Sequence, residues 1–312
     1  MRLTVFSCVV ALTLLVGSAA SAQPRTPRTP RRGRPQTSET VASGEPAAPA
    51  PTLEDLATVV PRLQSADPDE VMAAIDQLSV IDDPAVVAPL VAMLRAGQPD
   101  AITERGLVAL RGLAEPSSLD CLAEFTRHRR PAVRRRAYAA VAAIQDPRSR
   151  ALLEQGLRDS DRQVRGECAD QLGRTGAHAS LDLLFRAFER GVIEAAAAIG
   201  RLGDDPSVAR FDEHLGHAPL SVMLSGYEQY LRRSDIDEDT KVDIVGRLGE
   251  VSGRTVREFL GQYLLTFSER DRSRLRTVVR DTLARIPLDA PTARPTSAAT
   301  TATAPATTGG AQ

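Results

Sequence analysis

The chain contains 312 residues with a formal net charge of −1, and it has three cysteines and no tryptophan. Residues 52–287 alone contain 32 basic and 37 acidic residues, a net charge of −5. This balance argues against nucleic acid as a general partner, because duplex binding usually needs a basic face. Three cysteines, of which Cys8 lies in an apolar leader, also argue against a fold built on disulfide bonds.

The first 22 residues have the pattern of an export signal. Arg2 provides the basic start, residues 3–16 form the apolar run, and Ala20-Ser21-Ala22 offers small residues for cleavage. This apolar run is short against the ~20 residues needed to span a bilayer. We therefore expect a cleaved signal, a mature chain without a transmembrane segment, and export to the periplasm or the medium of a bacterium.

Residues 23–51 and 288–312 lack the composition of a packed domain. The first segment is rich in proline, the second is rich in threonine, alanine and proline, and the first also contains Arg25, Arg28, Arg31, Arg32 and Arg34. Such segments bury too little apolar surface to offset the chain entropy lost on ordering, so both are predicted to be disordered. The favoured role of residues 25–34 is a solubilising tether, and the alternative is contact with an anionic surface.

The central part, residues 52–287, repeats with one fixed period over four units. Two sets of residues fall into register at this period: Val71, Ile102, Val133 and Val164, and Ile75, Gly106, Ala137 and Cys168. A fixed period of about 31 residues, with two helical patterns in each unit, predicts an α-solenoid. The expected helix pairs lie near 53–81, 84–114, 117–145, 148–176 and 178–203.

Local signals mark the ends of these helices. Asp146-Pro147 is expected to begin the first helix of the fourth unit, and Gly173 and Gly176 are expected to end its second helix. Three residues of the turn between these helices can cap the second one: Asp159, Ser160 or Asp161.

The period shortens and then breaks toward the C-terminal end. The string Leu-Gly-Arg-Thr-Gly at 172–176 returns as Ile-Gly-Arg-Leu-Gly at 199–203, and then as Val-Gly-Arg-Leu-Gly only at 245–249. The second interval is much the longer one. It departs from the period near Pro219 and leaves room for an extra helix around 219–233. Two last helices are expected near 254–267 and 269–286. The sequence thus predicts an all-α fold, an α-solenoid of about six to seven antiparallel helix pairs between disordered tails.

The second-helix pattern of the fourth unit resembles that of HEAT repeats, and most closely the short bacterial units called PBS-lyase-type HEAT repeats. The residues that carry the resemblance are Val164-Arg165 followed by Ala169, Leu172 and Gly173. The similarity covers residues 53–203 clearly and 204–287 loosely. It implies a structural ladder of turn aspartates and second-helix arginines, which in this chain would be Arg134, Asp159, Asp161 and Arg165. It implies little about function, because one fold hosts many functions.

The densest charge cluster runs from Arg127 to Arg136, with Glu124 as the nearby counter-charge. Arginine binds carboxylates and phosphates in a bidentate manner, so this cluster is a candidate site for an acidic partner. Polar second-helix positions of the third and fourth units are expected to line the concave side. The candidate partner-binding residues from both sets are Arg129, Arg130, Arg135, Arg136, Glu167, Asp170 and Arg174. The alternative for all of them is a solvated surface.

The sequence motifs do not indicate catalysis, a metal or a cofactor. His214 and His217 form a short histidine string without a repeated partner, and the His-Glu pairs that hold iron in HEAT-like hydroxylases are absent from the sequence. Cys121 and Cys168 align with apolar residues of other units, so they are expected to be buried free thiols.

These patterns favour an exported, non-enzymatic scaffold or adaptor that binds another protein through its concave helical face. Two alternatives remain at this point. The first is an accessory enzyme of the pigment-lyase type, which the resemblance implies. The second is a protein that attaches to the envelope or to a polyanion through the basic N-terminal arm.

Overall fold

The structure is a computed structural model, and it describes residues 56–287. The predicted export signal at 1–22, linker at 23–51 and tail at 288–312 lie outside the described residues. Within 56–287 the secondary structure is helical and contains no strand, apart from one isolated bridge between Leu215 and Ala218. The all-α prediction is therefore confirmed for this part of the chain.

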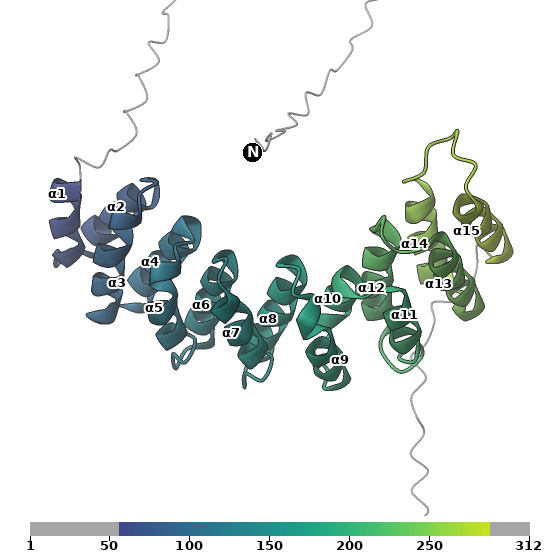
Figure 1. Cartoon of the computed structure of the whole chain (residues 1–312), viewed down its shortest axis with the longest axis horizontal. Helices are drawn as coiled ribbons and strands as arrows, with labels where there is room; N and C mark the ends of the chain where they lie inside the picture. The colour runs from purple at the N-terminus through teal and green to yellow at the C-terminus, as the bar shows by residue number, and fades with distance from the viewer. Residues whose placement is uncertain (1–55, 288–312) are drawn as a thin grey trace, which may run out of the picture. The chain divides into compact units, whose positions relative to one another are not determined.

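The helices alternate between two layers (Figure 1). The first helices are α1 (Leu56–Val59) with the 3-10 helix η2 (Val60–Gln64), α3 (Val87–Arg95), α5 (Leu119–Phe125), α7 (Pro147–Gly156), α9 (Leu181–Glu189) and α11 (Asp205–Asp212). The second helices are α2 (Pro68–Ser79), α4 (Asp100–Leu113), α6 (Pro131–Ala143), α8 (Arg162–Arg174), α10 (Ala195–Leu202) and α12 (Leu220–Arg232). The last three helices are α13 (Glu238–Val251), α14 (Arg254–Leu264) and α15 (Arg274–Arg285).

The predicted start and stop signals act largely as expected. Asp146 caps α7 by accepting the backbone N–H of Arg148 at 2.7 Å, with proline at the first helical position, and Asp161 caps α8. Gly176 follows α8 with φ +70°, a left-handed conformation that favours glycine. Gly173, in contrast, does not end the helix. It lies inside α8, where it allows a close contact with α10.

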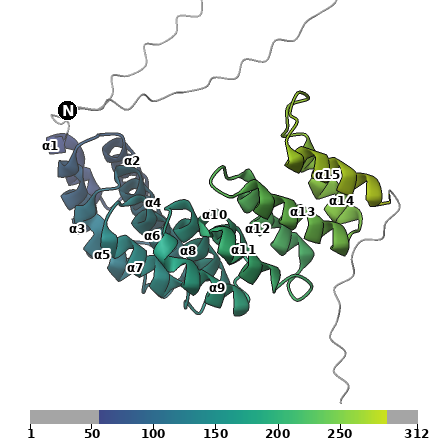
Figure 2. The same cartoon turned by 45° about the vertical axis from the view of Figure 1, so that its right-hand side comes forward.

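The core lies between the two layers and repeats with the period of the sequence. In α6 and its end, Val133, Ala137, Val141 and Ile144 are all buried. Each second helix also packs against the second helix of the next unit, from α2 through α4, α6, α8 and α10 to α12. The turned view shows these helices in order side by side (Figure 2). A single α-helix of this length is marginal in water, so packing between units supplies most of the stability.

The break in the array lies later than the sequence predicts. The expected extra helix is α12, and it packs against α10 as the second helix of a sixth pair. The regular order therefore continues past Pro219. The change comes between α12 and α13, which share few contacts, after which α13 and α15 pack closely against each other. The sequence pattern did not show this, because α11 is short and the Gly-Arg-Leu-Gly string returns only in α13 and not in α12.

Candidate interaction surfaces

The second helices form a continuous layer, and glycine permits their close approach at two crossings. A Cβ atom at Gly173 on α8 would lie 2.8 Å from Cα of Ala198 on α10, and one at Gly200 on α10 would clash with the carbonyl oxygen of Gly226 on α12. A larger residue would push the helices apart, since protein interiors are close-packed. The short distance between backbones brings polar side chains at the helix edges within reach of the next helix.

Ion pairs link neighbouring second helices along the exposed side of this layer. Arg105 on α4 pairs with Asp76 on α2 at 2.5 Å, and both side chains are about half exposed, at 51% and 47%. Arg201 on α10 pairs with Asp170 on α8 at 2.7 Å. Exposed pairs of this kind contribute only about 0–1 kcal/mol each to stability. Their main structural effect is to hold long side chains in fixed positions along the layer, which we call the second-helix face.

Six of the seven predicted partner-binding residues have polar partners on this face or at its edge. These contacts are Arg130–Asp100, Arg135–Gln163, Arg136–Glu104, Glu167–Gln171 and Asp170–Arg174. Of the six predicted residues, all except Arg130 lie on α6 or α8. The structure therefore brings them into one region. Arg129 differs, because its exposed side chain has no hydrogen bond or ion pair within residues 56–287. The arginine cluster is therefore partly neutralised by its neighbours.

Arg134 and Asp159, two of the four predicted ladder residues, form a bidentate ion pair. The guanidinium of Arg134 donates to both carboxylate oxygens of Asp159, at 2.8 and 2.6 Å, and the two side chains are only 11% and 9% exposed. Arg134 also donates to the backbone oxygens of His128 and Arg129. Burial raises the pKa of Asp159, but the hydrogen bonds from Arg134 and from the backbone of Asp161 outweigh it, so that pKa lies below its usual range.

The other two ladder residues have different partners in the α7–α8 turn. Asp161 accepts the backbone N–H groups of Gln163 and Val164, at 2.9 and 3.1 Å. Arg165 donates to the backbone oxygens of Asp159 and Ser160. One repeat period after Asp159 the chain has Arg190, so the ladder position itself carries no carboxylate in the next unit. The implied ladder therefore consists of the Arg134–Asp159 ion pair and of Asp161, which caps the start of α8.

The junction after α12 contains a buried carboxylate that the sequence patterns did not reveal. Asp212, at the end of α11, accepts a hydrogen bond from Tyr227 Oη at 2.6 Å and pairs with Arg247 of α13 at 2.8 Å. The Asp212 side chain is 7% exposed, and burial raises its pKa even though Tyr227 and Arg247 lower it. The sequence held one clue, since Arg247 occupies the arginine position of the repeated Gly-Arg-Leu-Gly string.

The turn that leads into α13 is held by a second arginine. Arg233 donates to the backbone oxygens of Gly200 and Gly203 and pairs with Asp235 at 2.5 Å. These contacts tie the α12–α13 turn to the end of α10. The junction is thus polar, whereas the contacts between the regular second helices are dominated by apolar and small residues.

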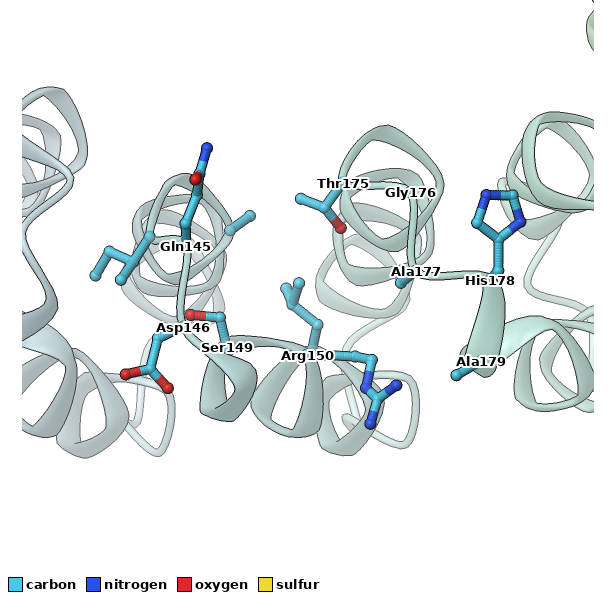
Figure 3. A pocket seen from close by; sticks show the side chains of 12 residues that line it. Gln145, Asp146, Ser149, Arg150, Thr175, Gly176, Ala177, His178 and Ala179 are labelled. Carbon is cyan, nitrogen blue, oxygen red and sulfur yellow. The ribbon is translucent and has the colours of Figure 1, made fainter. Parts of the chain in front are cut away.

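A groove of about 480 Å³ lies where the α6–α7 turn faces the turn after α8 (Figure 3). Its lining combines apolar residues with Gln145, Arg150 and His178, and the Nδ1 atom of His178 lies 2.9 Å from the backbone oxygen of Leu202. Ser149 borders it as a buried residue whose hydroxyl has no hydrogen-bond partner among the described residues. The groove therefore has size enough for a small ligand, but its polar groups do not converge on one point (Figure 3).

The unpartnered hydroxyl has a reason in the repeat register. Ser149 and Ser180 are one repeat period apart, and Ser180 donates to Glu154 Oε1 of the preceding unit at 2.6 Å. The position equivalent to Glu154 in the unit before Ser149 is Ala123, which offers no acceptor. Ala123 therefore explains why Ser149 lacks the side-chain acceptor that Ser180 has.

Cys121 and Cys168 are buried free thiols, as the sequence predicts. Burial raises the pKa of Cys121 to about 11, so its reactive thiolate is scarce at neutral pH. Residues 56–287 contain no group of three or more His, Cys, Asp or Glu side chains that could hold a metal ion. Nor does any helix in this range have the length and apolar character to cross a membrane.

Comparison with known proteins agrees with the fold. A family model described as HEAT repeats matches residues 105–168 and 118–200. A search of curated protein sequences gives no match. A chain in a homology model of the full-length AP-3 complex in an intermediate open conformation is similar with a TM-score of 0.52 and 14% identity. That match covers 73% of this chain and 49% of the AP-3 chain, so this chain spans about half the length of that structure.

A second similar structure is the complex of CpcE and CpcF of phycocyanin lyase from Nostoc sp. PCC7120. The match has a TM-score of 0.41 and 16% identity, and it covers 80% of this chain and 99% of the other. At these identities a likeness to solved structures concerns the fold alone. The family match and the two helix layers show that residues 105–200 of this chain are HEAT repeats within a helical solenoid.

Proposed function

We propose that this chain is a non-enzymatic scaffold or adaptor that binds another protein through its second-helix face. A solenoid of HEAT repeats is suited to protein interaction because its stacked helices present a long continuous surface. The second-helix layer lies on the inner side of the curved stack (Figure 1), where it can surround part of a partner.

The observation that carries the proposal is the order of the polar side chains on this face. Ion pairs and hydrogen bonds run across the second helices from Asp76 on α2 to Gln229 on α12. They hold arginine and carboxylate side chains in fixed positions before any partner binds. Fixed side chains lose less conformational entropy on binding, which favours specific recognition. Mixed charges of this kind suit a polar protein interface better than a small-molecule pocket.

Site-specific photo-crosslinking in the native host tests the proposal. A photoreactive residue replaces Arg136 or Arg174 on the second-helix face, and in control variants it replaces Ala151 or Gln155, which are exposed on α7 in the other layer. We expect one protein to be crosslinked from both second-helix positions and from neither α7 position. Equal crosslinking from the two layers, or none from the second-helix face, would reject this face as the binding surface.

We also propose that the chain is exported, on the basis of the signal-like pattern in its first 22 residues. Fractionation of the native host followed by mass spectrometry of the N-terminal peptide tests this. The expected peptide begins at Gln23 in the exported fraction, and an intact Met1 peptide in the cytoplasm would contradict it.

A further inference from the structure

We propose that the turns between first and second helices in three consecutive units bind an extended acidic segment of a partner protein. The turns are α5–α6, α7–α8 and α9–α10. We call the binding surface the basic edge and define it by Arg127, Arg129, Arg158, Arg162 and Arg190. This edge is distinct from the second-helix face, so the inference goes beyond the proposed function.

The five arginines of the basic edge share an unusual property. All are exposed, and none has an ion pair or a side-chain hydrogen bond within residues 56–287. Most other arginines of this range pair with a carboxylate or donate to a backbone oxygen. The described part of the chain contains three more arginines without such a partner, Arg111, Arg270 and Arg272. Unpaired arginines are thus concentrated on three neighbouring turns.

Contacts between the turns show that they lie next to one another. Arg134 bridges the first two turns, because its guanidinium contacts the backbone oxygen of Arg129 and the carboxylate of Asp159. Arg158 and Arg190 line the same small recess, which connects the second turn with the third. The apolar side chains of Leu157 and Leu183 also line that recess. The edge therefore combines a row of positive charges with a small apolar contact point.

The acidic residues in and beside these turns form no ion pair with the five arginines of the basic edge, and Glu194 of the third turn has a buried carboxylate oxygen without a hydrogen-bond partner in the described structure. Asp159 is occupied by Arg134, and Asp161 by two backbone N–H groups at the start of α8. Glu189 lies 3.6 Å from Arg210 of α11, which draws its charge away from the edge. The guanidinium groups of the basic edge therefore remain free for bidentate contacts with carboxylates of another molecule.

The spacing of the turns favours an extended peptide. Packed helices are about 8–10 Å apart, so successive turns repeat at about that distance. A polyproline II chain rises about 3.1 Å per residue with three residues per turn, so an acidic residue at every third position repeats at about 9 Å on one side. Such a peptide places one carboxylate at each turn.

The charges on either side favour a short acidic segment over a long polyanion. Residues 56–100 contain seven acidic and two basic residues, and residues 203–250 contain eleven acidic and five basic ones. A nucleic-acid duplex that continued past the basic edge would meet these acidic regions. A peptide that spans only three turns would not.

Fluorescence anisotropy with the full-length chain and a labelled peptide of five Glu-Ala-Pro repeats tests the inference. The main variant combines Arg127→Gln, Arg158→Gln and Arg190→Gln, which removes one arginine from each turn. The matched control combines Arg111→Gln, Arg270→Gln and Arg272→Gln, which removes the same charge from unpaired arginines elsewhere. A third variant changes the same three edge arginines to lysine, and circular dichroism confirms that all variants fold. The basic N-terminal arm is present in every protein, so differences between variants report on the edge.

We expect the wild-type chain to bind the peptide at low salt and to lose binding as salt screens the charges. The edge glutamine variant binds about tenfold more weakly, since each exposed charge contact contributes a factor of a few. The control variant stays within about twofold, the lysine variant binds more weakly than the wild type but more tightly than the glutamine variant because it keeps the charge and loses the bidentate contacts, and a Gln-Ala-Pro peptide does not bind. Absence of peptide binding, or equal loss in the edge and control variants, would overturn the inference. Edge-dependent binding of an oligothymidylate or of phosphatidylglycerol vesicles without peptide binding would also overturn it.

Discussion

The string Gly-Arg-Leu-Gly occurs twice, at 200–203 where α10 ends and at 246–249 in α13, and the two copies have different neighbours. Gly200 lies against the backbone of α12, with no room for a Cβ, whereas Gly246 has open space. Arg201 joins the row of ion pairs on the second-helix face, whereas Arg247 pairs with the buried Asp212 at the junction. The same four residues therefore form a close helix crossing in one region and a polar junction in the other.

This difference shows which properties are local and which depend on the neighbouring unit. Both copies form the end of a helix, because that depends on nearby residues. The packing depends on what lies opposite. In the regular part, α10 meets α12 along its length, while α13 shares few contacts with α12 and packs with α15. A solenoid is held together by contacts between nearest neighbours, so this junction divides the array energetically.

The largest expected effect comes from adding one methyl group to each copy of the string. Gly200→Ala places a Cβ against the backbone of Gly226, and we expect it to lower the free energy of unfolding by about 3 kcal/mol. Gly246→Ala meets no atom within 4 Å, and it raises stability by about 0.5–1 kcal/mol because alanine favours helix. Urea denaturation followed by circular dichroism measures both. Similar changes in the two variants would show that the two copies pack alike.

The arginines of the two copies should differ by a smaller amount. Arg247→Met leaves the buried Asp212 carboxylate with Tyr227 as its remaining partner, and we expect a loss of about 2 kcal/mol. Arg201→Met costs less than about 1 kcal/mol, since the Asp170 side chain is 32% exposed and keeps Arg174 as a partner. Thermal denaturation of both variants compares them. A larger loss for Arg201→Met would contradict the contrast between the two regions.

A third comparison concerns two serines within the regular part. Ser180→Ala removes the hydrogen bond to Glu154, and we expect a loss of about 1 kcal/mol. Ser149→Ala removes a buried hydroxyl that has no hydrogen-bond partner in the described structure, so it leaves stability unchanged or raises it slightly. Denaturation midpoints of the two variants check this. If the two substitutions lower stability by the same amount, the explanation based on Ala123 is wrong.

The smallest expected effect is a difference in pH dependence between two buried aspartates. The pKa of Asp159 is lowered in the folded chain, so its contribution to stability is present above its unfolded pKa and is lost as the pH falls through its folded pKa. The pKa of Asp212 is raised, so the folded state takes up its proton first and the fold gains stability from this group as the pH falls. The stability of Asp159→Asn therefore approaches that of the wild type on acidification. The stability of Asp212→Asn decreases relative to that of the wild type over the same pH range.

Melting temperatures of the wild type and both variants between pH 3 and 7 measure this difference. Each asparagine variant is the control for the other, because both remove a buried carboxylate that pairs with one arginine. The same trend in both variants would contradict the opposite environments of the two aspartates.

The fold was predictable because its signals are local and repeated. The repeat register placed Val133, Ala137 and Val141 in the core, and they are buried. Asp146 and Asp161 begin helices for reasons that lie within two or three residues of them. The role of Gly173 was not predictable in this way, because its reason is the backbone of α10.

The candidate surfaces were less predictable, because charge in a sequence does not show which charges are paired. The cluster from Arg127 to Arg136 looks uniform in the sequence. In the structure Arg134 forms a buried ion pair with Asp159. Arg130 and Arg136 form ion pairs with acidic residues of the preceding unit. The Arg127 side chain has no ion pair or hydrogen bond within residues 56–287. The pairing follows from the stacking of units, which determines the distance from each arginine to its acid.

Hydrogen exchange measured by mass spectrometry tests the central claim most directly, namely that the packed layer changes at the α12–α13 junction. We predict that the amides of α13 to α15 exchange together as one cooperative unit, with less protection than those of α4 to α12. Arg247→Met should speed exchange in α13 to α15 and leave α4 to α8 unchanged. Equal protection across residues 56–287, with the variant affecting the whole range alike, would contradict the claim.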